Sequence, residues 1–426
     1  MNKNQPSLRR LCTGGLGFAL FAILNLAAAR PGESASFTPV DVPFNGILSG
    51  DGSTIAGQLP SGAPFIWDAE NGITGLTGFV GAGEVRRISS DGSRLVGFTD
   101  HVDPSENEVY TWDVNEGTRI IRRIPDSVPN FSFLSNLDHL SDVSLDGSTV
   151  VGAYRPGLPA DTSRRPFIWD TQENRIDNLR DLVDGTISIR GIRLSEDGSI
   201  LAAANSQGAL LWNTTNRATD PAEPIQIPGL LGPDIALSAD GSTLVGSAHF
   251  RQGFPGSNDF IMGEASIWTA ATGLETLPSR EEGTTATLGE VAFRFGGTGM
   301  RTVVVSDDGS TVAGRSEQVR NGPSSSDTAV VWDDIHGTQA LKLRLAMLGI
   351  DLDGWQLTEV VDISADGRTL FGNGINPDGV AVGFLAVIPE PGTATLISLG
   401  LMGLAIRPRK AVGHIGVRAE RGTASP

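Results

Sequence analysis

The sequence predicts an all-β protein, and specifically a seven-bladed β-propeller of four-stranded blades. Of its 426 residues, 54 are glycine, which suits many short strands and tight turns better than helices. A Ser-x-Asp-Gly phrase between two apolar runs returns seven times, and a phrase ending in Trp follows the first six copies. A unit of this length repeated along the whole chain is typical of propellers.

The Ser-x-Asp-Gly phrase predicts the first hairpin of each blade. Asp-Gly between apolar runs is typical of a two-residue type I′ turn, which needs positive φ at both central residues. The preceding serine is placed to hydrogen-bond to the turn backbone. The seven predicted turns are Asp51-Gly52, Asp91-Gly92, Asp146-Gly147, Asp197-Gly198, Asp240-Gly241, Asp308-Gly309 and Asp366-Gly367.

Each unit is predicted to contain a strand before the turn, one after it, one ending in Trp, and a short fourth strand. Consecutive apolar residues such as Leu244-Val245 indicate strands that are covered on both faces. In the seventh unit, Phe384-Leu385 stands where Trp is expected, and the unit ends one strand short at Ile388. The segment 36–40 is predicted to supply the missing strand and close the ring, which removes an unpaired sheet edge.

These two phrases together resemble the HAF family of extracellular repeats and, more distantly, WD-repeat blades. The resemblance spans roughly residues 40–388 by the repeat count. The fourth unit departs from the pattern, because Ala202-Ala203 stands where an apolar residue and glycine are expected. The resemblance implies an extracellular propeller.

Residues 1–29 have the three parts of a secretory signal peptide. A basic start ends in Arg9-Arg10, an apolar stretch runs over residues 16–26, and Ala27 and Ala29 form an A-x-A cleavage site. We expect cleavage after Ala29. The arginine pair leaves a twin-arginine route open, although the residues after it match that motif poorly.

Charge and cysteine content exclude several classes of function. The net charge is −17 and both ends of the chain are basic, so the body between them is more acidic still. Such a surface repels phosphate backbones, which excludes nucleic acid as a partner. Cys12 is the only cysteine and leaves with the signal peptide, so the mature chain is expected to lack disulfides and thiolate metal sites.

The C-terminus resembles the PEP-CTERM signals that an exosortase system processes in Gram-negative bacteria. Pro389, Glu390 and Pro391 precede an apolar run over 393–406, and the basic residues Arg407, Arg409 and Lys410 follow it. The resemblance implies processing at the Pro-Glu-Pro tripeptide after transient membrane anchoring. A run of about 14 residues is short for an independent helical span but suits a transient anchor with a positive-inside stop. A plain membrane anchor and a buried hydrophobic element are the alternatives.

The predicted organisation is therefore a signal peptide over 1–29, a propeller over 30–388, a sorting signal with a hydrophobic helix over 389–410, and a basic tail over 411–426. Members of the PEP-CTERM family generally end soon after the basic cluster, and this chain continues past it.

The sequence offers no catalytic constellation, and we predict a non-enzyme without cofactor or metal. The five histidines have no metal-binding spacing. The paired carboxylates Asp307-Asp308 and Asp333-Asp334, and Asp351 with Asp353, occupy positions where turn chemistry favours aspartate.

Binding is expected on the face opposite the Asp-Gly turns. If these turns join the first two strands of each blade, the longest and most variable loops share the other face, where insertions usually carry function. The most aromatic of these loops contains Phe250, Arg251, Phe254 and Phe260, which are the candidate binding residues.

The predicted function is that of an exported cell-surface or biofilm-matrix protein of a Gram-negative bacterium. Its expected partners are an exosortase-type enzyme, the inner membrane before processing, and extracellular polysaccharide or surface proteins. The alternative is an extracellular propeller enzyme, such as a glycan lyase or hydrolase, because propellers also host enzymes. A purely structural repeat is a third possibility.

Overall fold

The computed structural model describes residues 34–42, 46–78, 82–100, 108–123, 137–154, 165–179, 189, 191–205, 207–215, 224–251, 261–277, 303–317 and 327–389. The chain divides into two compact units, Met1–Ser34 and Ala35–Pro426. Every strand named below belongs to the second unit, as does the helix.

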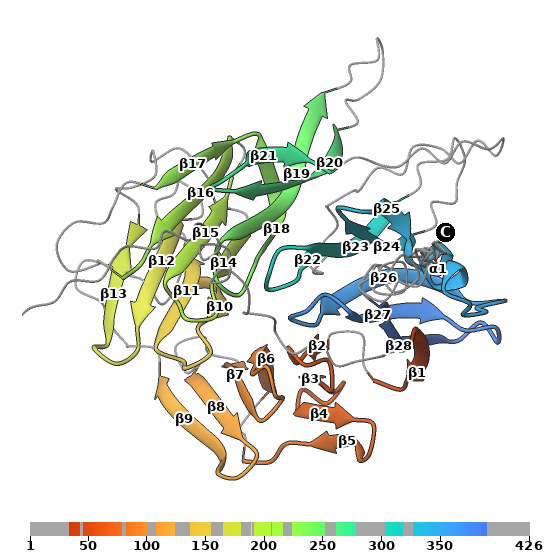
Figure 1. Ribbon diagram of the computed structural model, residues 1–426. Helices are drawn as coiled ribbons and strands as arrows, with labels where there is room; N and C mark the ends of the chain where they lie inside the picture. Colours follow the sequence, from red (N-terminus) through yellow and green to blue (C-terminus); the bar gives the residue numbers. More distant parts are fainter. Residues whose placement is uncertain are drawn as a thin grey trace, which may run out of the picture. The chain divides into compact units, whose positions relative to one another are not determined.

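Seven four-stranded antiparallel sheets form the blades of a propeller (Figure 1). Blade 1 contains β2 (Ile47–Leu48), β3 (Thr54–Gln58), β4 (Pro64–Asp68) and β5 (Gly72–Gly75). Blade 2 contains β6 (Ala82–Ile88), β7 (Arg94–Asp100), β8 (Glu108–Asp113) and β9 (Gly117–Arg123). Blade 3 contains β10 (Leu137–Val143), β11 (Thr149–Tyr154), β12 (Arg165–Asp170) and β13 (Arg175–Asn178).

The remaining blades follow the same order from the inner to the outer strand. Blade 4 contains β14 (Gly191–Leu194), β15 (Ile200–Ala204), β16 (Gly208–Asn213) and β17 (Ile225–Pro228). Blade 5 contains β18 (Leu230–Leu237), β19 (Thr243–Arg251), β20 (Ile261–Thr269) and β21 (Gly273–Thr276). Blade 6 contains β22 (Val303–Val305), β23 (Thr311–Glu317), β24 (Asp327–Asp333) and β25 (Gly337–Ala340). Blade 7 contains β26 (Gln356–Ile363), β27 (Thr369–Ile375), β28 (Ala381–Val387) and, from the start of the chain, β1 (Ser36–Val40).

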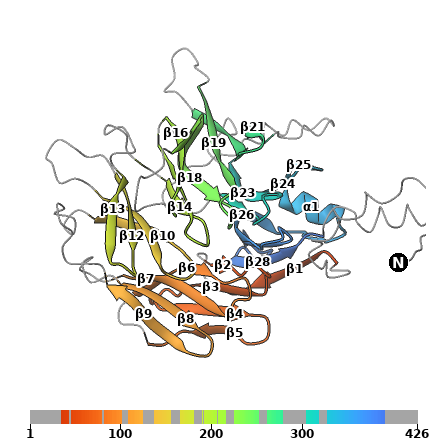
Figure 2. The same cartoon turned by 60° about the vertical axis from the view of Figure 1, so that its left-hand side comes forward.

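The blades form a closed ring in which each packs on the next. The first strand of every blade contacts the first strand of the following blade, and β26 of blade 7 contacts β2 of blade 1 (Figure 2). Seven buried hydrophobic clusters lie between the blades, one at each junction. The predicted strands covered on both faces are confirmed, because Leu244 and Val245 face different clusters and neither is exposed.

The N-terminal strand closes the ring as predicted. Residues of β1 pair antiparallel with β28, from Ser36 opposite Val387 to Val40 opposite Gly383. Blade 7 is thereby completed by the two ends of the propeller, and its outermost edge is provided by β1 rather than by the exposed edge of β28.

The tryptophan of each of the first six blades lies opposite the second residue of the second strand, as Trp67 does opposite Ile55. In blade 7 the residue in this register is Ala386, opposite Leu370. The prediction that Phe384-Leu385 takes the place of tryptophan is therefore wrong by one to two residues. The sequence match followed side-chain size, whereas the strand register places a fully buried alanine there.

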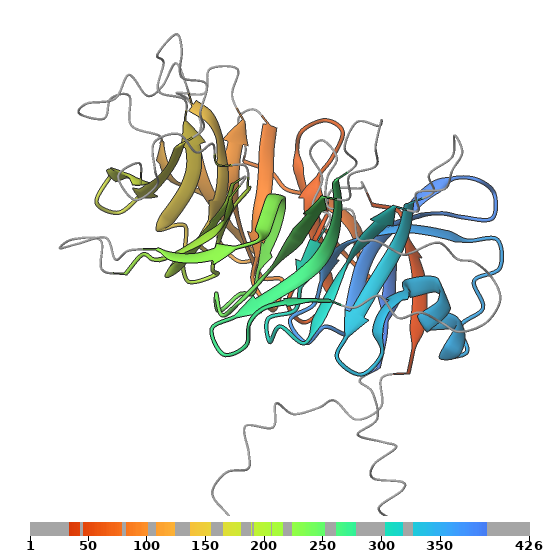
Figure 3. The ribbon, with the colours of Figure 1, turned by 90° about the horizontal axis from the view of Figure 1, so that it is seen from above.

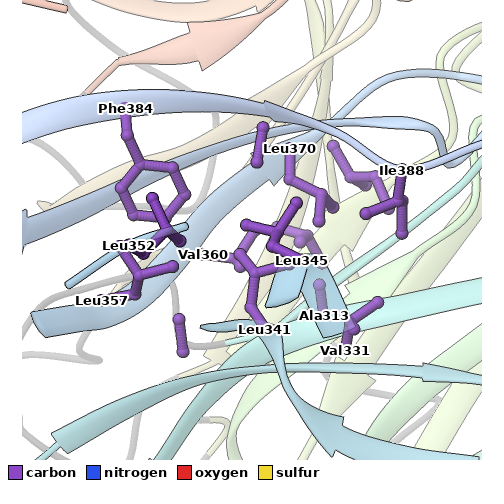
Figure 4. Close-up of a cluster of buried hydrophobic side chains, with 14 residues drawn as sticks. Ala313, Val331, Leu341, Leu345, Leu352, Leu357, Val360, Leu370, Phe384 and Ile388 are labelled. Atoms are coloured by element: carbon purple, nitrogen blue, oxygen red, sulfur yellow. The ribbon is translucent and has the colours of Figure 1, made fainter. Parts of the chain in front are cut away.

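A short helix, α1 (Leu341–Met347), lies between blades 6 and 7 and was not predicted. Figure 4 shows Leu341 and Leu345, which are both fully buried, directed into the cluster that contains Val331 and Leu370. The segment LKLRLAM consists of strong helix formers. The turn after it contains Gly349 with φ of 87°, a conformation that suits glycine at a helix C-terminus.

Candidate functional site

The Ser-x-Asp-Gly turns are built on a side-chain hydrogen-bond network that is the same in all seven blades. In blade 5, the Ser238 hydroxyl donates to Asp240 Oδ1 at 2.7 Å and accepts from the Thr243 N–H at 3.0 Å. Asp240 Oδ1 also accepts from the Ser242 N–H at 2.8 Å. The predicted hydrogen bond from serine to the turn backbone is thus confirmed, and the equivalent serine makes it in the other six blades.

The turn geometry differs from the type I′ prediction. In blade 1, the Gly52 N–H donates to the Ser49 carbonyl at 2.9 Å, which closes a four-residue turn from serine to glycine. Gly52 has a φ of 73°, but Asp51 has no positive φ. The same holds in the other six turns. The serine and aspartate side chains bridge the turn while the aspartate keeps a negative φ. Only the glycine adopts the left-handed backbone conformation.

These turns also connect neighbouring blades. The residue between Ser and Asp donates its N–H to the matching carbonyl of the next blade, as Glu196 does to Ala239 at 2.8 Å. Leu145, Asp307 and Ala365 make the same bond, and at the first junction Asp51 donates to Ser90. The turn face is therefore fastened from blade to blade at five junctions.

Hydrogen bonding at the turns affects aspartate ionisation. The hydroxyl of Ser89, followed by the backbone and side chain of Ser93, lowers the pKa of Asp91 to about 2. This aspartate is a charged acceptor committed to the turn, which fits the predicted structural role of the Asp-Gly positions.

The strand order places the loops on two faces of the propeller. The first-to-second and third-to-fourth strand turns share one face, which we call the turn face. The second-to-third strand loops and the connections between blades share the other, which we call the loop face. This agrees with the predicted separation (Figure 3). The five longest and most variable segments that the sequence predicts on the loop face are 100–108, 153–165, 247–263, 279–300 and 315–327. The segment 279–300 lies wholly outside the described residues, 247–263 lies outside them in part, and the other three lie mainly outside them.

The candidate binding residues are only partly within the described chain. Phe250 and Arg251 belong to the end of β19, where they pair with Met262 and Ile261 of β20. The prediction placed them in a loop, but the hairpin extends further than the apolar pattern indicated. Phe254 and Phe260 lie outside the described residues. The end of β19 that carries Phe250 and Arg251 and the paired start of β20 lie at the loop face, because these are the second and third strands of blade 5.

A central cavity of about 150 Å³ opens among the inner strands near the turn face. Its walls include the last residues of several inner strands and the variable residue of several Ser-x-Asp-Gly phrases. The charged residues that line it are Arg86, Arg87, Glu196, Asp307 and Asp362. None of these was predicted as a site residue. The sequence signal that could have found them is their position, either just before a Ser-x-Asp-Gly phrase or at its variable residue.

Two buried or half-buried aspartates hold neighbouring inner strands together beside this cavity. Asp142 Oδ2 accepts from the Leu194 N–H at 3.0 Å and pairs with Arg87 at 2.8 Å. Asp362 Oδ2 accepts from the Leu48 N–H at 2.8 Å. Each carboxylate therefore accepts a hydrogen bond from a backbone N–H of the neighbouring blade, which is a structural role.

Asp307 has a different environment from the other turn acids. Partial desolvation, followed by repulsion from Glu196 and Asp362, raises its pKa to about 6. The sequence assigned Asp307-Asp308 to turn chemistry. That is correct for Asp308, which accepts from the Ser306 hydroxyl at 2.7 Å, and incomplete for Asp307, which lines the cavity.

The other predicted turn acids and one histidine serve local structure. Asp333 Oδ1 accepts from the backbone of Ile335 and His336 and contacts His336 Nδ1 at 2.7 Å. Asp351 Oδ1 accepts from the Asp353 N–H at 3.0 Å. Across the described ranges, no group of three or more His, Cys, Asp or Glu side chains is arranged to hold a metal ion.

The end of blade 7 leads directly into the predicted sorting signal. Val387 ends β28, and Ile388 is 6% exposed with its N–H bonded to the Arg368 carbonyl at 2.8 Å. A family model for the PEP-CTERM protein-sorting motif matches residues 387–410. The chain carries a PEP-CTERM sorting motif. It is accordingly an exported protein that is sorted by an exosortase and anchored in a membrane before processing.

The first residues of the PEP-CTERM motif are thus part of the folded blade. Pro389 is described, whereas Glu390, Pro391, the apolar run over 393–406 and the basic residues Arg407, Arg409 and Lys410 lie outside the described residues. Within the part that is described, no helix has the length and apolar character needed to cross a membrane.

Several solved structures are similar to the PEP-CTERM chain over most of its length. An oligogalacturonate lyase in complex with manganese is 13% identical, covers 84% of this chain and 97% of its own, and has a TM-score of 0.49. The β-propeller domain of the Trilobed protease from Pyrococcus furiosus is 10% identical, and the match covers 83% of this chain and 93% of that domain with a TM-score of 0.45. TolB from Acinetobacter baumannii is 12% identical, covers 81% and 66%, and has a TM-score of 0.38. No curated protein sequence matches the chain.

Proposed function

We propose that this protein is a non-catalytic binding propeller of the cell surface or extracellular matrix, and that its loop face binds extracellular polysaccharide or a surface protein. The observation that carries the proposal is the position of the two ends of the propeller. Ser36 at the start of β1 lies opposite Val387 at the end of β28, and Val387 lies opposite Thr369 beside the Asp366-Gly367 turn. Both ends therefore lie at the turn face.

This placement supports binding by the loop face. While the PEP-CTERM segment holds the chain in the membrane, the turn face is directed to the bilayer and the loop face away from it. The turn face carries seven nearly identical turns with the same hydrogen-bond pattern, whereas the loop face carries the insertions that differ from blade to blade. Insertions on one face of a repeat architecture are where binding function concentrates.

The test is binding of the purified full chain to extracellular polysaccharide from the producing strain, with and without calcium. The decisive variant combines Phe250→Ala, Phe254→Ala and Phe260→Ala, the aromatic residues of the predicted binding segment. Val114→Ala is the control, since Val114 is 58% exposed in a turn-face loop. We expect the triple variant to bind at least about tenfold more weakly, which corresponds to ~1.4 kcal/mol, and the control to bind normally. Equal binding by all three proteins would contradict the proposal.

A second candidate, a glycan lyase or hydrolase, is favoured by one observation. Asp307, with its pKa raised to about 6, lies with Glu196 and two arginines around the central cavity. A carboxyl group with such a pKa is suited to proton transfer near neutral pH. Release of reducing ends from the same polysaccharide, lost in Asp307→Asn, would establish this function in place of the proposed one.

A further inference from the structure

We propose that the outer corner of blade 6 at the turn face contacts the lipid surface while the sorting segment is still attached. The corner consists of four exposed apolar side chains, Ile335, Leu343, Met347 and Leu348. The inference rests on the PEP-CTERM motif and does not depend on what the loop face binds.

Three of the four exposed apolar side chains belong to α1 and its C-cap, and the fourth, Ile335, lies in the turn that Arg344 of α1 contacts. Ile335 is 62% exposed, Leu343 40%, Met347 63% and Leu348 39%. The described part of the chain exposes nine large apolar side chains, and four of them are at this corner. Blade 1, on the other side of blade 7, contributes Ile73 alone. Exposed apolar groups that gather in one place mark an interaction surface more often than scattered ones do.

Fixed contacts hold the corner together at the turn face. Although α1 lies in the connection between blades 6 and 7, its Arg344 reaches the turn face and donates to Asp333 Oδ2 at 3.2 Å. Asp333 begins the third-to-fourth strand turn that contains Ile335. Arg344 is only 5% exposed, so a largely buried ion pair holds the helix against that turn. Leu341 and Leu345 anchor the inner side of α1, which leaves Leu343 and Met347, one helical turn apart, facing outward.

The same corner is next to the end of blade 7, where the sorting motif begins. Ile388 lies in the buried cluster that contains Leu341 and Leu345 of α1 (Figure 4). The predicted apolar run begins at residue 393, and the four peptide units from residue 389 span at most about 14 Å. The tether is therefore too short to hold the turn face of blade 7 far from the bilayer.

The tether is also off the propeller axis. It leaves from β28, which is the third strand of its blade counted from the centre. A body held at its rim tilts so that the rim near the tether approaches the surface, and here that rim carries the apolar corner. Amphipathic segments with such exposed side chains lie at the boundary between headgroups and acyl chains.

Charge near the corner favours an apolar contact over an electrostatic one. Lys342 is exposed, but so are Asp334 and the acids of the following loop, Asp351 and Asp353. Among the described residues, the corner therefore has no basic patch for anionic headgroups, and the contact should form on zwitterionic lipid and persist at high salt.

The experiment uses the full chain with Cys12→Ala, which leaves no other thiol, and a single Met347→Cys carrying an environment-sensitive fluorophore. The protein is reconstituted through its uncleaved tail into phosphatidylcholine vesicles. Val380→Cys is the matched control, because Val380 is 54% exposed in the turn between β27 and β28, on the loop face of blade 7. We expect the label at 347 to shift to shorter wavelength and to be quenched by bromine-labelled lipid, and the label at 380 to do neither.

Solvent-like emission from both labels would overturn the proposal. So would a shift at 347 that disappears when the protein is diluted among vesicles, since that outcome indicates contact between copies of the chain. As a second measurement, the variant Leu343→Asp/Ile335→Asp in the Met347→Cys background should lose the shift while Val380→Cys is unchanged. Retention of the shift in that variant would also overturn it.

Discussion

Gly52 of blade 1 lies against Thr369 of blade 7, at the junction where the ring closes. A Cβ atom added to Gly52 would lie 2.6 Å from Thr369 Oγ1, and the glycine itself has a φ of 73°. In six of the seven Asp-Gly turns, the glycine is similarly set against the start of the second strand of the preceding blade. The glycine of the repeat thus serves both the hairpin and the packing between blades.

This relationship predicts the effect of Gly52→Ala. The substitution combines a left-handed backbone with a steric clash against another blade, so we expect a loss of about 2–4 kcal/mol of unfolding free energy. Gly72→Ala separates the two causes, because Gly72 has a φ of 66° but nothing within 4 Å of the added atom. It should cost about 1–2 kcal/mol. Urea denaturation of the three proteins measures the difference, and equal losses would contradict an interblade role.

The serine that opens each Ser-x-Asp-Gly turn is predicted to contribute more to the unfolding free energy than the polar residue that follows the glycine. Ser238→Ala removes a buried hydroxyl that donates to Asp240 and accepts from the Thr243 N–H. We expect a loss of about 1–3 kcal/mol, since the N–H is left buried without its partner. Ser242→Ala, at an exposed position of the same turn, should cost less than about 0.5 kcal/mol. Thermal unfolding of both variants tests this, and comparable losses would count against the network.

Much of the architecture could be predicted because it is encoded in short-range patterns. The Ser-x-Asp-Gly phrase fixed each first hairpin, and the missing strand after Ile388 correctly pointed to the segment 36–40. The turn type was wrong, since Asp-Gly alone does not distinguish a two-residue turn from one closed by the serine three residues earlier. The discriminating feature was the serine, whose hydroxyl bridges the turn.

Features that depend on contacts between blades were not predictable in the same way. The position of α1 is determined by the space between blades 6 and 7, and the register of Ala386 by the pairing of β27 with β28. Asp307 reads as one more turn acid in the sequence. Its proximity to Glu196, more than a hundred residues earlier, arises only when the ring closes.

Closure of the ring by β1 leads to a prediction about Phe37. Its ring centroid lies 4.9 Å from that of Trp355 and 5.4 Å from that of Phe384, so one side chain of β1 joins the edge strand to the core of blade 7. Phe37→Ala should cost about 2 kcal/mol and speed hydrogen exchange of the β28 amides. Thr38→Ala, on the exposed side of β1, is the control. Unchanged exchange in β28 would show that strand pairing alone holds the blade closed.

The raised pKa of Asp307 predicts a pH dependence with a definite sign. In the folded chain this pKa is about 6, above the ordinary value of 3.8, so between about pH 4 and pH 6 the native state binds more protons than the unfolded state. The unfolding free energy therefore falls as pH rises through that window, and the penalty is complete above it. Because partial solvent exposure screens these charges, the effect is modest. The unfolding free energy of Asp307→Asn should exceed that of the unsubstituted protein by about 1 kcal/mol at pH 7.5 and should equal it near pH 4.

Two further variants separate the effect of charges that line the central cavity from a general effect of removing a negative charge. Asp334→Asn removes the same charge from an exposed turn away from the cavity and should leave stability nearly unchanged. Glu196→Gln removes the strongest charge that acts on Asp307, so it should lower the pKa of Asp307 and give a smaller gain than Asp307→Asn. Urea denaturation at pH 4, 6 and 7.5 measures all four proteins. Two outcomes would show that the acids of the cavity do not interact as this geometry requires. The unfolding free energy could rise by the same amount at each pH in Asp307→Asn, or Asp334→Asn could show the same rise.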